Sequence, residues 1–112
     1  MAAAARQLLD SGTTLYLTDG ILGETAYVLM SVYKVPRAAI VDALLDLVAK
    51  ANIELWQLDE ERVIEALLLC RDSGRVSFAD AMLWASANSS RTARVYTFDR
   101  RFPGEGVEVV GV

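Results

Sequence analysis

Short strand-forming segments alternate with helical segments along the whole chain. The helical segments show apolar residues at helical spacing, as in Ile21, Val28, Leu29 and Val32. This alternation predicts an α/β fold, in which helices flank both faces of a parallel sheet and the crossovers are right-handed. The strand-forming segments are TLYLT (14–18), IELWQ (53–57), RVYTF (94–98) and VEVV (107–110).

Local signals predict where the helices begin and end. The chain opens on a helix-forming run, AAAARQLLD, whereas an alternating α/β domain usually opens on a strand. A side chain such as Asp19 can cap the helix that follows the first strand. Pro36 suits the first turn of the next helix. Asp59 and Ser77 are predicted to open the last two helices, the second of which covers about 78–88.

Composition narrows the chemistry that the chain can perform. Its 112 residues suit a single domain over 1–112, and 54% of them are hydrophobic, too many for a disordered chain. There is no histidine, and Cys70 is the one cysteine, so imidazole and multi-thiolate metal sites are excluded. Apolar runs are shorter than a membrane span, and Arg6 interrupts the N-terminus before any signal-peptide core forms. We therefore expect a soluble cytoplasmic protein.

Charge is distributed unevenly along the chain. Residues 1–72 carry 6 basic and 11 acidic side chains, whereas residues 73–112 carry 5 basic and 4 acidic ones. The overall net charge of −4 argues against broad electrostatic capture of nucleic acid. All five basic residues of the second part are arginines, whose planar guanidinium suits phosphate, although a solvated arginine surface is an equal explanation. They are Arg75, Arg91, Arg94, Arg100 and Arg101.

Three acids are predicted to meet at one edge of the sheet. Ligand sites in such sheets form at the carboxyl ends of the strands. Asp99 directly follows the strand RVYTF, and Asp80 begins the helix that precedes this strand. Glu24 lies in the helix after TLYLT and shares the apolar face of Ile21 and Val28. Two of the acids also have a structural explanation, since Ser77 and Asp80 fit a capping box and Asp99 suits a turn. Glu24 is harder to explain in this way, because a glutamate on an apolar stripe is uncommon without a partner.

Carboxylates that converge without histidine or cysteine favour a hard metal ion. Like charges repel and raise one another's pKa unless a cation lies between them. Oxygen ligands of this kind select magnesium or manganese. Such an ion can activate a water molecule and stabilise the transition state of phosphodiester cleavage.

The order and spacing of three segments resemble the PIN-domain family. The segments are GETAYVLMSVY (23–33), FADAMLWASA (78–87) and VYTFDRRF (95–102). The resemblance implies a three-layer α/β/α fold and cleavage of single-stranded RNA with magnesium or manganese, as in the ribonuclease toxins of bacterial toxin–antitoxin pairs. It also implies an antitoxin protein as a partner. Carried over by position, Glu24, Asp80 and Asp99 are the metal-binding catalytic acids, and Thr97, Arg100 and Arg101 lie near the substrate.

The chain departs from the family pattern at its N-terminus. The family opens with a central strand that ends in a catalytic aspartate, and neither Asp10 nor Asp19 matches that residue. We therefore expect the first central strand to be missing and metal binding and nuclease activity to be impaired. Without that strand, TLYLT and RVYTF must either pair directly or accept a segment from a second copy. Because exposed edges favour exchange of segments, we expect a homodimer.

Two alternatives to an active ribonuclease remain. The chain could be a non-catalytic member of the family that acts as a protein-binding or self-associating module. A receiver-like or nucleotide-binding α/β domain would need a glycine-rich phosphate loop or an acidic cluster with a well-placed lysine. Neither Lys34 nor Lys50 follows a strand, which disfavours this last interpretation.

Overall fold

A computed structural model of the chain describes residues 7, 10–71, 74–90, 94–97, 101–104 and 106–111. Helices and strands alternate in the order that the sequence predicts, and the α/β class is confirmed. The predicted opening helix falls largely outside the described residues. The elements are β1 (Leu15–Leu17), α2 (Asp19–Ser31), α3 (Arg37–Val48), β2 (Ile53–Leu55), α4 (Glu60–Arg71), α5 (Phe78–Ser89), β3 (Arg94–Thr97) and β4 (Glu108–Gly111).

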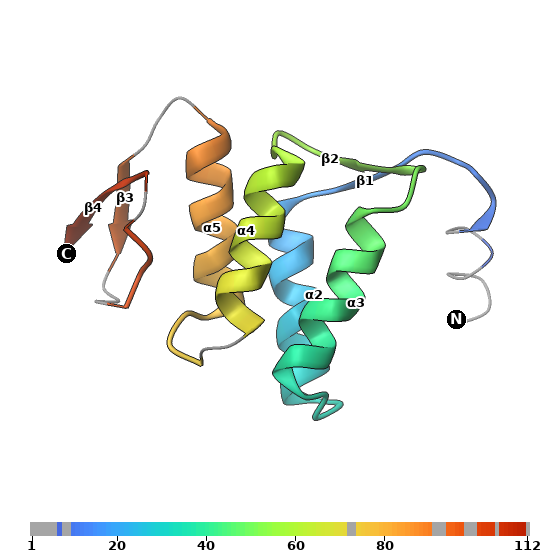
Figure 1. The fold of residues 1–112 in the computed structure, drawn as a ribbon, viewed down its shortest axis with the longest axis horizontal. Coiled ribbons are helices and arrows are strands. Elements are labelled where there is room, and N and C mark those ends of the chain that lie inside the picture. Colours follow the sequence, from blue (N-terminus) through green and yellow to red (C-terminus); the bar gives the residue numbers. More distant parts are fainter. Residues whose placement is uncertain are drawn as a thin grey trace.

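The strands form two separate parallel pairs. β1 pairs with β2 and β3 pairs with β4, so that Leu15 lies opposite Ile53 and Arg94 lies opposite Glu108. Figure 1 shows β3 and β4 beside α5 at one end of the molecule, whereas β1 and β2 cross near the ends of the other helices. Direct pairing of β1 with β3, one of the two outcomes expected from the sequence, does not occur in the described residues.

Each sheet leaves one side open to solvent. Tyr16 of β1 is 61% exposed and Tyr96 of β3 is 64% exposed. Parallel sheets normally have both faces covered by helices, so these exposed aromatic side chains mark faces that no described element covers. Tyr16 instead meets Trp56, which follows β2, in an edge-to-face contact with ring centroids 6.1 Å apart.

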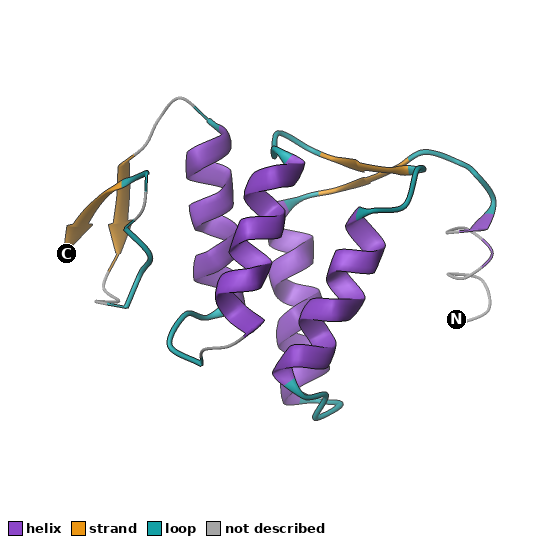
Figure 2. Ribbon diagram, viewed as in Figure 1, coloured by secondary structure: helices purple, strands orange, loops and turns teal. Residues whose placement is uncertain are grey.

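The core lies among the four helices (Figure 2). α5 packs against α2 and α4, and α4 packs against α3. Small side chains at the centre of α5, Ala81 and Ala85, are fully buried and allow the neighbouring helices to approach closely. The predicted apolar stripe of α3 is buried through Ile40, Leu44 and Val48. The helical layer thus supplies most of the buried apolar surface.

Helix caps agree with the sequence at α5 and correct it at α2. Ser77 is the N-cap of α5, and its Oγ accepts a hydrogen bond from the amide of Asp80 at 3.1 Å. At α2 the N-cap is Thr18 and not Asp19: the Thr18 Oγ1 accepts from the amide of Ile21 at 3.2 Å. Asp19 is the first helical residue, and a carboxylate there interacts favourably with the positive end of the helix dipole. Threonine and aspartate are both good N-cap residues, so the sequence alone does not show which of the two neighbouring positions caps the helix.

The β3–β4 unit is anchored to the helices by a buried turn. Phe102 and Pro103 are buried, and Phe102 belongs to the core cluster. Gly106 has a φ of +75° and lies against Asn88 of α5, whose Nδ2 donates to the carbonyl oxygen of Trp84 at 3.1 Å. A side chain at position 106 would therefore meet both backbone strain and a side chain that is itself held in place.

We predict that Gly106→Ala destabilises the protein by about 1–2 kcal/mol, because alanine at positive φ is strained and its Cβ would collide with the Asn88 amide oxygen. Urea unfolding measures this loss. The matched control is Gly23→Ala, whose Cβ would make an ordinary contact 3.5 Å from the Cα of Ala79. That change should be neutral or stabilise by up to about 1 kcal/mol, since alanine favours helix interiors. Equal effects of the two changes on the free energy of unfolding would contradict this prediction.

Candidate metal centre

Glu24 lies on the outer side of α2 in an open groove. The groove has a volume of about 320 Å³ and is lined by Glu24 with Ile21, Thr25, Val28 and Leu29. Glu24 thus shares a surface with Ile21 and Val28, as the helical spacing predicts. Its side chain is exposed and not buried. Water can therefore hydrate the carboxylate, which explains how an acid can occupy an otherwise apolar helix face.

Asp80 lies in the first turn of α5 and is half-buried. Its amide donates to the Oγ of the N-cap Ser77, which is the half of the predicted capping box that uses the backbone of Asp80. This hydrogen bond uses the backbone of Asp80, and a carboxylate at this place is also favoured by the helix dipole. The capping role of Ser77 is therefore compatible with a role of the Asp80 carboxylate as a ligand.

The contact between α2 and α5 brings the segments that carry these two acids together. The two helices run in opposite directions (Figure 1). They meet at Gly23, the residue before Glu24, where a Cβ would lie 3.5 Å from the Cα of Ala79, the residue before Asp80. Because Gly23 has no side chain, the backbones approach closely at this crossing. The packing thus brings together the residues that precede the two acids, while the Glu24 side chain itself lies in the open groove on α2.

The other predicted site residues are only partly described. Asp99 and Arg100 lie outside the described residues, so the meeting of three acids stays a prediction. Thr97 is half-buried at the end of β3, and Arg101 is exposed in the turn that follows. Within the described residues, no group of three or more acidic, histidine or cysteine side chains could hold a metal.

Glu24 and Asp80 suit magnesium or manganese in donor type, since both offer hard oxygen ligands. Two carboxylates alone give a weak site, and Asp99 would be the third ligand. The two acids that precede the site are engaged elsewhere: Asp10 lies 3.7 Å from the Lys50 ammonium, and Asp19 Oδ1 accepts from the amide of Gly20 at 2.9 Å.

Cys70 offers no thiolate for a metal. Burial raises the pKa of the Cys70 thiol to about 11, although the nearby positive charge of Arg37 opposes this shift. The thiol lies 3.9 Å from the carbonyl oxygen of Ser77, to which it donates a weak hydrogen bond. Cys70 is therefore a neutral, buried side chain, as the apolar run around it predicts.

Sequence reasoning missed Arg37, which joins three elements. Its Nη1 donates to the carbonyl oxygens of Cys70, at 3.2 Å, and Val76, at 3.1 Å. Its guanidinium carbon lies 4.8 Å from the centre of the Phe78 ring. No signal in the sequence identifies such a contact, because the carbonyl partners lie 33 and 39 residues away and any residue type carries a carbonyl.

Of the five arginines in residues 73–112, Arg94 forms an ion pair with Glu108 of the paired strand β4, with the Arg94 Nε 3.1 Å from a Glu108 carboxylate oxygen.

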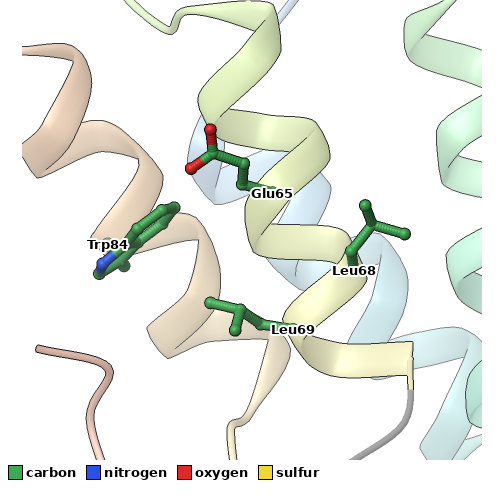
Figure 3. Close-up of a pocket in the computed structure, with 4 residues that line it drawn as sticks. All are labelled: Glu65, Leu68, Leu69 and Trp84. Atoms are coloured by element: carbon green, nitrogen blue, oxygen red, sulfur yellow. The ribbon is translucent and has the colours of Figure 1, made fainter. Parts of the chain in front are cut away.

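A second groove, between α4 and α5, is apolar (Figure 3). It has a volume of about 400 Å³ and is lined by Glu65, Leu68, Leu69 and Trp84. Glu65 binds the Arg62 guanidinium through both carboxylate oxygens, at 2.8 and 3.0 Å. One paired carboxylate among apolar side chains is unsuited to a metal, so this groove is separate from the candidate site.

Comparison with known families decides between a PIN-like domain and a receiver-like or nucleotide-binding α/β domain. The family model named PIN domain matches residues 1–104. The chain belongs to the PIN domain family. No match was found among curated proteins or among solved structures. PIN domains have nuclease-type functions in general and commonly use divalent metals, which agrees with the donor type of Glu24 and Asp80. In the described part of the chain, no helix has the length and apolar character needed to cross a membrane.

We predict that the Cys70 thiol is inert in the folded protein. With its pKa raised to about 11, the thiol stays protonated at pH 8 and should react with a disulfide reagent only when the chain unfolds. The neutral thiol contributes stability that is present below the pKa of an unfolded thiol, about 8.5, and that is lost as the pH rises through about 11. The test is the free energy of unfolding between pH 8.5 and 11, measured for the unaltered chain and for Cys70→Ala. The same dependence on pH in both proteins would contradict the prediction.

Proposed function

We propose that this PIN domain is a magnesium- or manganese-dependent endoribonuclease of the toxin type that acts on single-stranded RNA. The observation that supports the proposal is the crossing of α2 and α5, where Gly23 and Ala79, the residues that precede Glu24 and Asp80, lie against each other. Asp99, after β3, is proposed as the third acid. The match to the PIN family supports a nuclease-type function, and the toxin type rests on the resemblance of the sequence motifs.

Each residue of the proposed site has a defined role. Glu24, Asp80 and Asp99 hold the metal, which when bound would activate a water molecule and stabilise the charge of the phosphodiester transition state. Arg100 and Arg101 are suited to bind the RNA phosphates, because a guanidinium donates two parallel hydrogen bonds. Thr97 lies at the end of β3 and offers a hydroxyl to the same region.

We propose that metal binding is weak and nuclease activity impaired. Three acids leave magnesium short of protein ligands compared with a complete PIN site, and this ion tolerates irregular geometry poorly. The engagement of Asp10 by Lys50 and of Asp19 by the α2 backbone supports this part of the proposal. We propose an antitoxin protein as partner on the basis of the same resemblance, and a cytoplasmic location on the basis of the composition of the chain.

Self-association is a second candidate function, favoured by the divided sheet. β1 and β3 each have one hydrogen-bonded neighbour in the described residues, so each keeps an edge that can accept another strand. Buried backbone groups that lack partners cost about 1–3 kcal/mol each. We propose that a second copy of the chain covers these edges by exchanging a segment, which would give a homodimer.

We predict slow cleavage of a labelled single-stranded RNA in the presence of manganese. Glu24→Gln, Asp80→Asn and Asp99→Asn should each lower the rate tenfold or more, because each removes a metal ligand. The control is Asp46→Asn on the exposed side of α3, which should leave the rate unchanged. Calorimetry should show manganese binding weaker than micromolar.

Three outcomes would contradict parts of the proposal. Micromolar manganese binding that disappears in Glu24→Gln would show that three acids suffice to bind the metal. The proposed impairment of metal binding would then be wrong. Cleavage that survives all three substitutions would remove these residues as the site. Absence of both cleavage and metal binding in the unaltered chain would favour the non-catalytic, protein-binding alternative.

We predict that light scattering gives twice the chain mass of 12.2 kDa at micromolar concentrations. The physical reason is the pair of open strand edges at β1 and β3. Dilution should leave the mass unchanged over hours if segments are exchanged, because dissociation then requires partial unfolding. A mass of 12.2 kDa over a wide concentration range would rule out the dimer.

A further inference from the structure

We propose that Arg37 is a positioning residue that holds Asp80 in the geometry needed for metal binding. The inference rests on the proposed function in one respect, the role of Asp80 as a ligand. Arg37 is the first residue of α3, a helix that carries no acid of the proposed site. Its side chain is half-buried and reaches the turn that connects α4 with α5.

Arg37 fixes this turn on both sides of Ser77. Its Nη1 donates to the carbonyl oxygen of Val76, the residue before Ser77, at 3.1 Å. Its guanidinium group lies over the ring of Phe78, the residue after Ser77, at 4.8 Å. Hydrogen bonds from a charged donor are stronger than neutral ones, and a cation over an aromatic face adds attraction. Ser77 is thereby held between two contacts from the same side chain.

Ser77 passes this constraint to Asp80. The Ser77 Oγ accepts from the amide of Asp80 at 3.1 Å, and the Ser77 carbonyl oxygen accepts from the amide of Ala81 at 2.9 Å. These bonds form the first turn of α5. A shift of Ser77 would therefore move the backbone of Asp80 and reorient its carboxylate, and a metal ligand tolerates little displacement.

Arg37 also ties the turn to the preceding helix. The same Nη1 donates at 3.2 Å to the carbonyl oxygen of Cys70, in the last turn of α4. Carbonyls in the last turn of a helix lack intrahelical partners, and a positive charge there is favoured by the helix dipole. One nitrogen thus connects the end of α4 with the segment that begins α5.

The test is amide hydrogen exchange of the full chain, measured by NMR. Arg37→Met keeps much of the stem and removes the donor; it should speed exchange at Asp80 and Ala81 tenfold or more relative to Leu22 and Ala26 of α2. Arg37→Lys should restore part of the protection, because its ammonium can replace the nitrogen that makes both hydrogen bonds but does not stack on the Phe78 ring as a guanidinium does.

Two further variants keep the result decisive. Ile40→Val, on the same helix and fully buried, should change exchange at all four amides alike, since it lowers stability without touching the turn. If Arg37→Met fails to fold, Phe78→Leu removes the ring below the guanidinium and should speed exchange at Asp80 and Ala81 selectively. Uniform or unchanged exchange in the Arg37 variants, or no rescue by lysine, would overturn the proposal.

A metal titration separates this inference from the proposed function. If Asp80→Asn leaves manganese binding and RNA cleavage unchanged, the proposed function fails, whatever the exchange data show. If Asp80→Asn abolishes binding, Arg37→Met should weaken it about tenfold, as expected for residues that orient a ligand. Loss of binding in Asp80→Asn combined with unaltered affinity in Arg37→Met would reject Arg37 as a positioning residue.

Discussion

The burial of α5 against α2 and α4 is the interaction on which the rest of the structure depends. Half of the residues of α5 are buried, and two of them, Ala81 and Ala85, are small enough to bring the neighbouring helices close. The same packing determines the candidate site, because it sets Ala79 against Gly23 and thereby relates Asp80 to Glu24. Large residues at positions 23, 81 or 85 would separate the helices, since a packed interior has no spare volume. Stability and site geometry therefore depend on one contact surface.

Much of this arrangement is predictable from local sequence. Helical periodicity predicts α2, α3, α4 and α5, and short β-branched and aromatic runs predict the four strands, because each of these patterns reflects the side that an element buries. The placement of Glu24 and Asp80 on helices follows directly. Arg37 was not predictable: its contacts to Cys70 and Val76 are long-range and use backbone carbonyls, which leave no signature in side-chain identity. The sequence predicted Asp19 as the N-cap of α2, one residue after the actual cap Thr18, because threonine and aspartate are both good N-cap residues.

The alternation of elements predicts parallel pairing but not the continuity of the sheet. The strands are three or four residues long, so each pair gains few ladder hydrogen bonds, and β2 and β3 also contact α3 and α5. β1 and β2 are joined through α2 and α3, and β3 and β4 through the buried turn at Phe102. Nothing in those connections requires β1 to meet β3. The division of the sheet is therefore a property of tertiary packing, on which periodicity carries no information.

The proposed metal centre draws its ligands from two parts of the structure that differ in how they are supported. Glu24 and Asp80 belong to helices whose packing does not require a continuous sheet. Asp99, in contrast, follows β3, which is secured to the helices by Val95 in the core cluster, by its pairing with β4, and by the anchor formed by Phe102, Pro103 and the Gly106–Asn88 contact. A weakened anchor would displace the strand-borne ligand while leaving the two helix-borne acids in place. The strength of metal binding should therefore follow the docking of β3 and β4 onto α5, and a partner that covers the open edge of β3 would favour a complete site by mass action.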